Sequence, residues 1–180
     1  IQDFRISISK KIVSMGDFDP SDAEPEDLED YLDGGDMSEK VGVTYQIKVT
    51  YGDAKTPLKN VTITDALPEG LNYARGTSKL WFEQKSPDAV LSDEEKRVKN
   101  VEPLGNNTVL LWSVPEIKPG RWLYIEFDTS VSAADIPKCM LFENTARAEG
   151  YVETDTERVE RKTDDVNAVI YVGGESYNCQ

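Results

Sequence analysis

Apolar and polar residues alternate along most of the chain with a period of two. In the clearest run, Val41–Tyr51, every second residue is apolar, and the residues between are polar or glycine. Successive side chains of a β-strand lie on opposite faces, so this pattern predicts a strand with one buried face. The same alternation recurs over residues 4–8, 61–63, 110–114, 123–131 and 166–172.

Turn signals separate these runs, with Pro-Glu-Gly at 68–70, Gly-Asn-Asn at 105–107 and Pro-Gly at 119–120. Several strands with one apolar face each, joined by such turns, are typical of two packed antiparallel sheets. A length of 180 residues suits one domain. We therefore predict a single all-β domain over 1–180, an Ig-like antiparallel β-sandwich.

Three segments depart from the alternation. An acidic insertion at 15–40 is expected to hold a short helix over Pro25 to Leu32, because proline suits the first helical position and Gly34-Gly35 would end it. A polar stretch at 83–107 is expected to be a long connection with a helical turn near 93–99, and 173–180 forms a C-terminal tail.

The net charge of -14 comes mostly from the insertion. Residues 17–39 contain 11 acids and no Lys or Arg, so the other 23 of the 34 acids nearly balance the 20 bases. This charge makes nucleic acid an unfavourable partner. Clustered carboxylates suit calcium, and the candidate ligands are Asp17, Asp19, Asp22, Asp33 and Asp36. Their spacing does not fit an EF-hand loop, and a solvated acidic face is the alternative.

The chain has no histidine, which excludes Ser-His-Asp and Cys-His catalysis and most imidazole metal sites. No paired acids stand in a recognisable hydrolase setting, so we expect a protein that is not an enzyme. The two cysteines, Cys139 and Cys179, suit one disulfide within a secreted chain, a disulfide from Cys179 to a neighbouring chain, or two unrelated thiols. No apolar run approaches the roughly 20 residues of a membrane span.

Three polar residues fall at inward positions of apolar strand faces. Lys10 continues the face of Ile6 and Ile8, Asp65 follows Ile63 in register, and Asn144 lies two residues from Phe142 and Ala146. Buried polar groups are costly unless paired, so they could satisfy one another. They could also react, because burial favours a neutral lysine amine and a protonated aspartate that polarises the amide. The product would be a Lys10–Asn144 isopeptide.

Several stretches of the chain together resemble a known family. They are residues 43–50, residues 60–73 with the element Thr64-Asp65-Ala66-Leu67-Pro68-Glu69-Gly70-Leu71, Trp112, Lys118-Pro119-Gly120, Asn144-Thr145-Ala146 and the strand at 166–172. This family is the surface-protein repeat called domain of unknown function number eleven, and the resemblance covers most of 5–172. It implies an Ig-like sandwich of envelope, adhesive and filamentous proteins. Related fimbrial domains form isopeptides, and their lysine, catalytic acid and asparagine match Lys10, Asp65 and Asn144.

The sequence departs from this family in its acidic insertion and in Tyr51, where asparagine is common. The triad also has a purely structural interpretation. Lys10 would then reach water from a strand end, Asp65 would cap the following turn and Asn144 would bond to backbone.

Two further groups of residues are candidates for surface contacts. Trp122 and Tyr124 fall at outward positions and would serve as a subunit contact or, with Trp81, as a sugar platform, unless the 83–107 connection covers them. Asn60 and Asn106 stand in Asn-x-Thr sequons for glycosylation, and the turn makes Asn106 the better acceptor.

Together these features predict a secreted, extracellular or cell-surface structural subunit that associates with copies of itself in a filament, sheath or surface layer. Strand exchange through residues 1–12 is one route to such assembly. The alternative function is an adhesin or carbohydrate-binding module whose partner is a surface glycan or a host-cell envelope. Calcium is the only cofactor expected.

Overall fold

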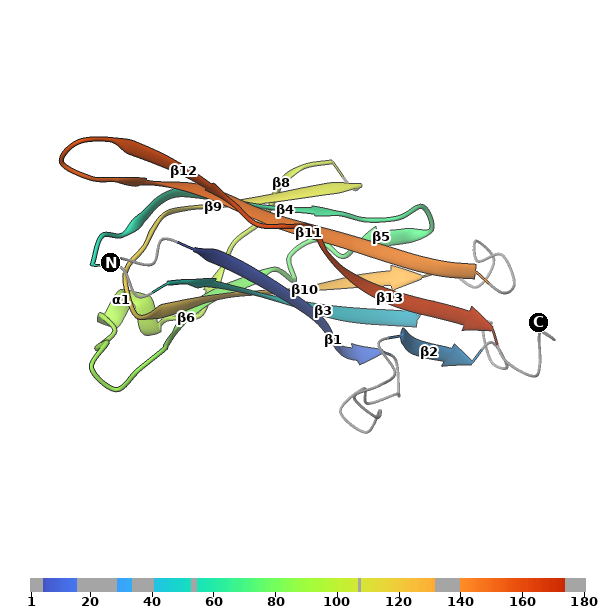
Figure 1. Cartoon of the computed structure of the whole chain (residues 1–180). Coiled ribbons are helices and arrows are strands. Elements are labelled where there is room, and N and C mark those ends of the chain that lie inside the picture. Colours follow the sequence, from blue (N-terminus) through green and yellow to red (C-terminus); the bar gives the residue numbers. More distant parts are fainter. Residues whose placement is uncertain are drawn as a thin grey trace.

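The computed structural model describes residues 5–15, 29–33, 41–52, 55–106, 108–131 and 140–173. Within these ranges the chain forms thirteen strands and one helix (Figure 1). They are β1 (Ile6–Met15), β2 (Glu29–Asp33), β3 (Val41–Tyr51), β4 (Leu58–Ala66), β5 (Leu71–Tyr73), β6 (Lys79–Gln84), α1 (Asp93–Lys96), β7 (Lys99–Asn100), β8 (Leu104–Gly105), β9 (Val109–Ile117), β10 (Arg121–Val131), β11 (Met140–Glu153), β12 (Arg158–Lys162) and β13 (Val166–Gly173).

The strands form two sheets that pack face to face, which confirms the predicted all-β sandwich. Sheet A has the order β1-β3-β10-β6-β7, with β5 also paired to β10. Sheet B has the order β2-β13-β11-β4-β9-β8, with β12 also paired to β11. All described pairings are antiparallel except that of β2 with β13. In the order of sheet A, β1 is an edge strand, and β3 is its described partner.

The core consists of the inward residues of both sheets, as the alternation predicts. On β10, Leu123, Ile125 and Phe127 are fully buried, whereas Trp122 and Tyr124 on the opposite face are partly exposed. Trp112 on β9 packs against Phe127 and donates a hydrogen bond from its indole nitrogen to Ser78 Oγ over 2.7 Å. Each fully buried side chain of this size contributes roughly 1.5–3 kcal/mol, so the core holds the two sheets together.

The prediction of a helix over Pro25 to Leu32 is wrong for the residues of this range that the structure describes. Residues 25–28 lie outside the described residues, and Glu29–Asp33 form strand β2, which pairs in parallel with Val169–Gly173 of β13. A helix of eight residues is marginal by itself. The edge of β13 offers backbone donors and acceptors, and pairing with it outweighs the local helical preference.

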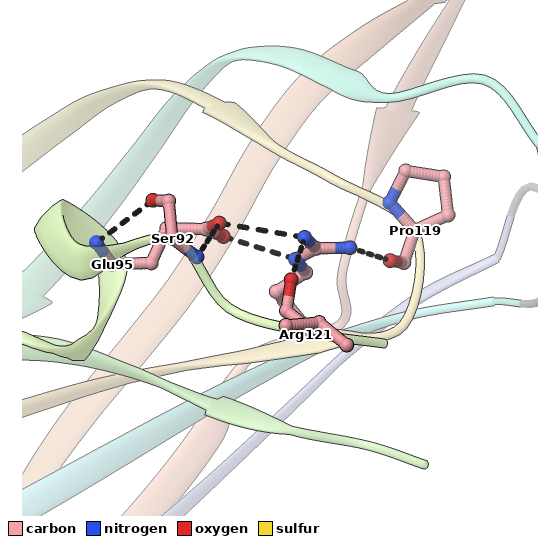
Figure 2. Close-up of polar contacts among 5 residues, drawn as sticks. Ser92, Glu95, Pro119 and Arg121 are labelled. Atoms are coloured by element: carbon pink, nitrogen blue, oxygen red, sulfur yellow. Dashed lines mark hydrogen bonds and ion pairs between the residues drawn. The ribbon is translucent and has the colours of Figure 1, made fainter. Parts of the chain in front are cut away.

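The 83–107 connection contains the predicted helical turn, and a clamp fixes it against the β9–β10 turn (Figure 2). Ser92 and Glu95 form a capping box at α1, and the Glu95 carboxylate accepts a hydrogen bond from Arg121 Nε over 3.0 Å. Arg121 also donates to the carbonyls of Pro119 and Val90, each over 2.8 Å. The connection is therefore held at this end of the sandwich.

Candidate functional site

Lys10, Asp65 and Asn144 come from three different strands and meet in the core. Lys10 lies on β1 of sheet A, opposite Ile47. Asp65 lies on β4 of sheet B, opposite Ala146 of β11, and Asn144 is two residues from Ala146 on the same face. Since β1 packs across the sandwich against β11, the lysine of one sheet faces the acid and amide of the other.

Lys10 and Asp65 are in direct contact. Lys10 Nζ donates a hydrogen bond to Asp65 Oδ2, and both side chains are 0% exposed. The ammonium nitrogen lies 4.8 Å from the ring centre of Tyr45 and 5.9 Å from that of Phe127. The lysine therefore does not reach water from a strand end, and its surroundings are aromatic and dry.

Burial shifts both members of the pair toward their neutral forms. Burial lowers the pKa of Lys10 to about 8, although the charge and hydrogen bond of Asp65 act in the opposite direction. Burial likewise raises the pKa of the Asp65 carboxyl, against the opposing effects of Lys10 and Asn144. In a low-dielectric site, moving one proton from the amine to the carboxylate removes both charges. The amine then becomes a nucleophile and the carboxyl becomes an acid.

Asn144 is fully buried, and its amide has no geometrically complete hydrogen bond. Among the described residues, neither Nδ2 nor Oδ1 of Asn144 has a partner, and Asp65 Oδ1 has none. Asn144 is nevertheless close enough to Asp65 to affect the pKa of its carboxyl. An unsatisfied buried polar group costs about 1–3 kcal/mol. The amide is thus held beside the Asp65 carboxyl without a geometrically complete hydrogen bond to any described residue.

The arrangement contains the groups that acyl transfer from an amide requires. Lys10 supplies the nucleophile, Asn144 the electrophilic carbonyl carbon, and Asp65 a proton donor and acceptor between them. The sequence predicted these three residues together but missed the aromatic walls. Tyr45 and Phe127, whose rings stack with centres 5.7 Å apart, were recognisable only as core positions.

The predicted surface aromatics form a row across the outer face of sheet A. Trp81 stacks on Tyr124 with ring centres 5.4 Å apart, and Lys48 Nζ lies 3.6 Å from the ring centre of Trp122. The 83–107 connection is fixed by Arg121 at the β9–β10 turn, whereas these aromatics contact residues of β3 and β6. Trp122 and Tyr124 remain candidates for contact with another molecule.

The two sequons occupy different local structures. Asn60 is exposed at an irregularity of β4 and has a positive φ of 53°. Asn106 is exposed, but its Oδ1 accepts hydrogen bonds from the backbone of Thr108 and Val109 and from the Thr108 hydroxyl, over 2.6–2.9 Å. Glycosylation at either position stays a prediction.

Other predicted sites lie outside the described residues. These are Asp17, Asp19, Asp22 and Asp36 of the calcium hypothesis and both cysteines, Cys139 and Cys179; Asp33 is described only as part of β2. The described residues contain no group of three or more metal-ligating side chains. Calcium binding and the disulfide stay predictions.

Comparison with known proteins defines the fold class. No protein-family model matches the chain, and no curated protein matches its sequence. The chain is similar to the major pilin subunit BcpA of Bacillus cereus, at 14% identity and a TM-score of 0.59, over 93% of this chain and 40% of that one. It is also similar to the pilus backbone protein of Streptococcus pneumoniae, at 13% identity and a TM-score of 0.51, over 87% and 34% of the two chains.

A looser match is the collagen-binding domain of a Staphylococcus aureus adhesin, at 12% identity and a TM-score of 0.48, over 92% of this chain and 96% of that one. The two pilin structures show that the fold is an Ig-like sandwich, whereas no family model supports the specific repeat family suggested by the sequence. In the described residues, no helix has the length and apolarity to span a membrane.

Proposed function

We propose that the chain is a structural domain of a cell-surface or extracellular assembly and that an isopeptide bond between Lys10 and Asn144 ties its two sheets together. The observation that carries this proposal is the fully buried contact of Lys10 with Asp65, beside an amide that has no hydrogen-bond partner among the described residues. The low identity to the pilins makes their fold a supporting observation and leaves the function to be tested.

The reaction balances without a cofactor. The neutral Lys10 amine attacks the Asn144 side-chain carbonyl carbon, while protonated Asp65 donates a hydrogen bond to the carbonyl oxygen. The new Nζ–Cγ bond forms and the Cγ–Nδ2 bond breaks. The proton lost by the amine reaches Nδ2 through Asp65, and ammonia leaves. Asp65 ends as it began, so it is the catalytic residue of a single turnover.

This chemistry favours a structural role over an enzymatic one. The reaction would consume its own lysine and asparagine, so it happens once per chain. The product joins the edge strand β1 to the central strand β11 of the opposite sheet. Such a bond serves a protein whose task is to stay folded outside the cell, where we place this chain.

An adhesin is the second candidate, and one observation favours it. The stacked pair of Trp81 and Tyr124, together with Trp122, leaves aromatic surface partly exposed on sheet A. Aromatic side chains on a sheet supply apolar contact area for a sugar or a protein. A stable monomer that binds a surface glycan, and loses the binding in Trp81→Ala and Tyr124→Ala variants, would support this function over assembly.

Intact-mass measurement tests the crosslink. We expect the folded chain to be lighter than its sequence by one ammonia, and a digest to contain one branched peptide joining the segments around Lys10 and Asn144. Asp65→Ala should restore the full mass, whereas Asp128→Ala, a control on the outer face of sheet A, should not. A wild-type chain of full mass after prolonged incubation at neutral pH would refute the crosslink.

A further inference from the structure

Two aromatic rings of sheet A form a wall beside the Lys10 side chain. Tyr45 of β3 and Phe127 of β10 lie directly opposite each other on neighbouring strands, and both are fully buried. Lys10 Nζ lies 4.8 Å from the ring centre of Tyr45 and 5.9 Å from that of Phe127. Both distances are within the roughly 6 Å over which a cation is attracted to an aromatic face. The amine therefore has two ring faces as neighbours in addition to Asp65.

The register of β1 brings the lysine to these rings. Lys10 lies opposite Ile47 on β3. Its next inward neighbour on β1, Ile12, lies opposite Tyr45. The lysine side chain thus leans along β1 toward Tyr45, and its nitrogen also comes within reach of Phe127 on the strand beyond. A lysine has many rotamers, so a wall that selects one of them determines where the nitrogen lies.

Further aromatic contacts hold the wall itself. The rings of Tyr45 and Phe127 stack with an angle of 25° between their planes. Phe127 also packs against Trp112 of sheet B, with ring centres 5.1 Å apart, and against the edge of Tyr73 at 6.3 Å. The Trp112 indole is fixed in turn by its hydrogen bond to Ser78. Moving Phe127 would disturb both sheets, so the two rings are a preorganised support for the amine.

The surroundings of Lys10 also determine when its amine is charged. Burial lowers the pKa of Lys10 to about 8, against the charge and hydrogen bond of Asp65. The groups that face the amine from the strands packed around it are Asp65 on β4, Asn144 on β11, Ala168 beside Asn144 on β13, Tyr45 on β3 and Phe127 on β10. Of these, Asp65 and the Tyr45 phenol titrate. An ammonium against ring faces keeps its proton to higher pH than one against aliphatic side chains.

The rings therefore have two effects on crosslink formation. They hold the nitrogen in place, and a nucleophile displaced by about 1 Å can react about 100-fold more slowly. They also favour the ammonium form, which cannot attack a carbonyl carbon. The reactive pair shares one proton, so the rate passes through a maximum between the loss of its first and second protons. Without the ring faces, both limbs of this pH profile would lie at lower pH.

We propose that Tyr45 and Phe127 are positioning residues of the Lys10–Asn144 crosslink, whose rings fix the attacking amine and set the pH range in which it attacks. This inference deepens the proposed isopeptide and rests on it. The alternative is that the rings only fill the core. In that case, their electronic character would be irrelevant to the reaction.

Refolding at several pH values tests the proposal. The full chain is made by cell-free synthesis, purified in denaturant and diluted into buffers from about pH 6 to about pH 10. Circular dichroism follows folding, and intact mass follows the loss of ammonia. Phe127→Leu and Tyr45→Leu should lower the peak rate about 10- to 100-fold and move the profile about 0.5–1.5 pH units to lower pH. Tyr45→Phe, which keeps the ring, should recover most of the rate that Tyr45→Leu loses.

Two further variants separate the electronic effect of a ring from its shape. Phe127→pentafluorophenylalanine keeps the ring but reverses the charge distribution on its face. It should move the profile to lower pH while losing less of the peak rate than Phe127→Leu. The matched control is Tyr51→Leu, which removes a buried ring from the same face of β3. This ring lies roughly 20 Å from Tyr45 at about 3.4 Å per residue, so the control should crosslink like the wild type.

An equilibrium measurement on a chain that cannot react complements the rates. In Asn144→Ala, the Lys10 amine remains free, and NMR of its side chain gives its pKa directly. Adding Phe127→pentafluorophenylalanine or Phe127→Leu should lower this pKa by about 0.5–1.5. Adding Tyr51→Leu should leave it unchanged. This measurement depends on neither the folding rate nor the chemistry of the crosslink.

Three outcomes would count against the inference, and they differ in what else they exclude. A pH profile that loses height without moving, together with an unmoved Lys10 pKa, would assign the rings to packing alone. Ring variants that crosslink at the wild-type rate and pH would also overturn the inference and leave the isopeptide standing. A wild-type chain that folds but keeps its full mass at every pH would exclude the isopeptide itself and, with it, this role of the rings.

Discussion

Replacement of Asn144 by alanine separates a reactive triad from a merely buried one, because the first case predicts a large loss of stability and the second predicts little change or a small gain. The substitution removes the acyl group of the isopeptide and leaves the Lys10–Asp65 contact in place. Without a crosslink, it deletes an amide whose two polar atoms have no partners among the described residues. With a crosslink, it cuts the covalent tie between the sheets.

The size of the effect follows from the loop that the bond closes. Lys10 and Asn144 are 134 positions apart. In the chain-entropy treatment used for disulfides, a loop of this length raises the free energy of unfolding by about 5 kcal/mol. In an uncrosslinked chain, loss of an unsatisfied buried amide relieves about 1–3 kcal/mol, which offsets the small cavity that alanine leaves.

Thermal unfolding followed by circular dichroism, with intact mass on the same samples, distinguishes the two cases. A loss of about 5 kcal/mol lowers the melting temperature by roughly 10–20 °C in a domain of this size. Lys10→Met should abolish the crosslink as well. Adding Asn144→Ala to Lys10→Met should then change the melting temperature little, because no bond remains to be lost.

An Asn144→Ala variant that melts at or above the wild-type temperature would refute the crosslink reasoning, even if the wild-type mass were ambiguous. An equal fall in the wild-type and Lys10→Met backgrounds would also refute it, because such additivity shows that Asn144 stabilises through packing alone.

Three further perturbations test other parts of the structure. In Asn144→Ala, the free energy of unfolding should rise from about pH 8 to pH 10 in urea titrations. Lys10 has a pKa of about 8 in the folded chain, so over this range the folded chain has released a proton that the unfolded chain still holds. Lys10→Met should lack this rise. Arg121→Ala should lower the free energy of unfolding by about 1–3 kcal/mol and speed amide hydrogen exchange in the 83–107 connection, because the Glu95 carboxylate and two backbone carbonyls lose their donor. Unchanged exchange would contradict the clamp. Gly120→Ala should destabilise more than Gly76→Ala in denaturant titrations, because both have a positive φ but only the Cβ at Gly120 would meet another side chain, at 2.6 Å.

The sandwich and the triad were predictable from the sequence for the same physical reason. Side chains of a strand alternate between faces, so Lys10, Asp65 and Asn144 had to point inward wherever their neighbours did. Two packed sheets leave one shared interior, which restricts where three inward polar groups can lie. The alternation does not give the order of strands, so the meeting of all three in one place required the structure.

Strand β2 was beyond sequence reasoning because its pairing depends on which strand edge is available to it. The pattern of Leu28, Tyr31 and Leu32 fits a helix as well as a strand, and only the free edge of β13 decides between them for residues 29–33.

The core energetics favour the proposal that the triad reacts. The unreacted site buries three polar atoms, two on Asn144 and one on Asp65, that have no hydrogen-bond partner among the described residues. Apolar side chains of similar volume would avoid this cost and are often as stable as a buried ion pair or more so. Isopeptide formation removes one of these atoms outright by releasing Nδ2 as ammonia. It also gives β1, an edge strand with β3 as its described neighbour in sheet A, a covalent attachment to sheet B. An arrangement that is costly before reaction and stabilising after it is more readily understood as a reactant than as packing.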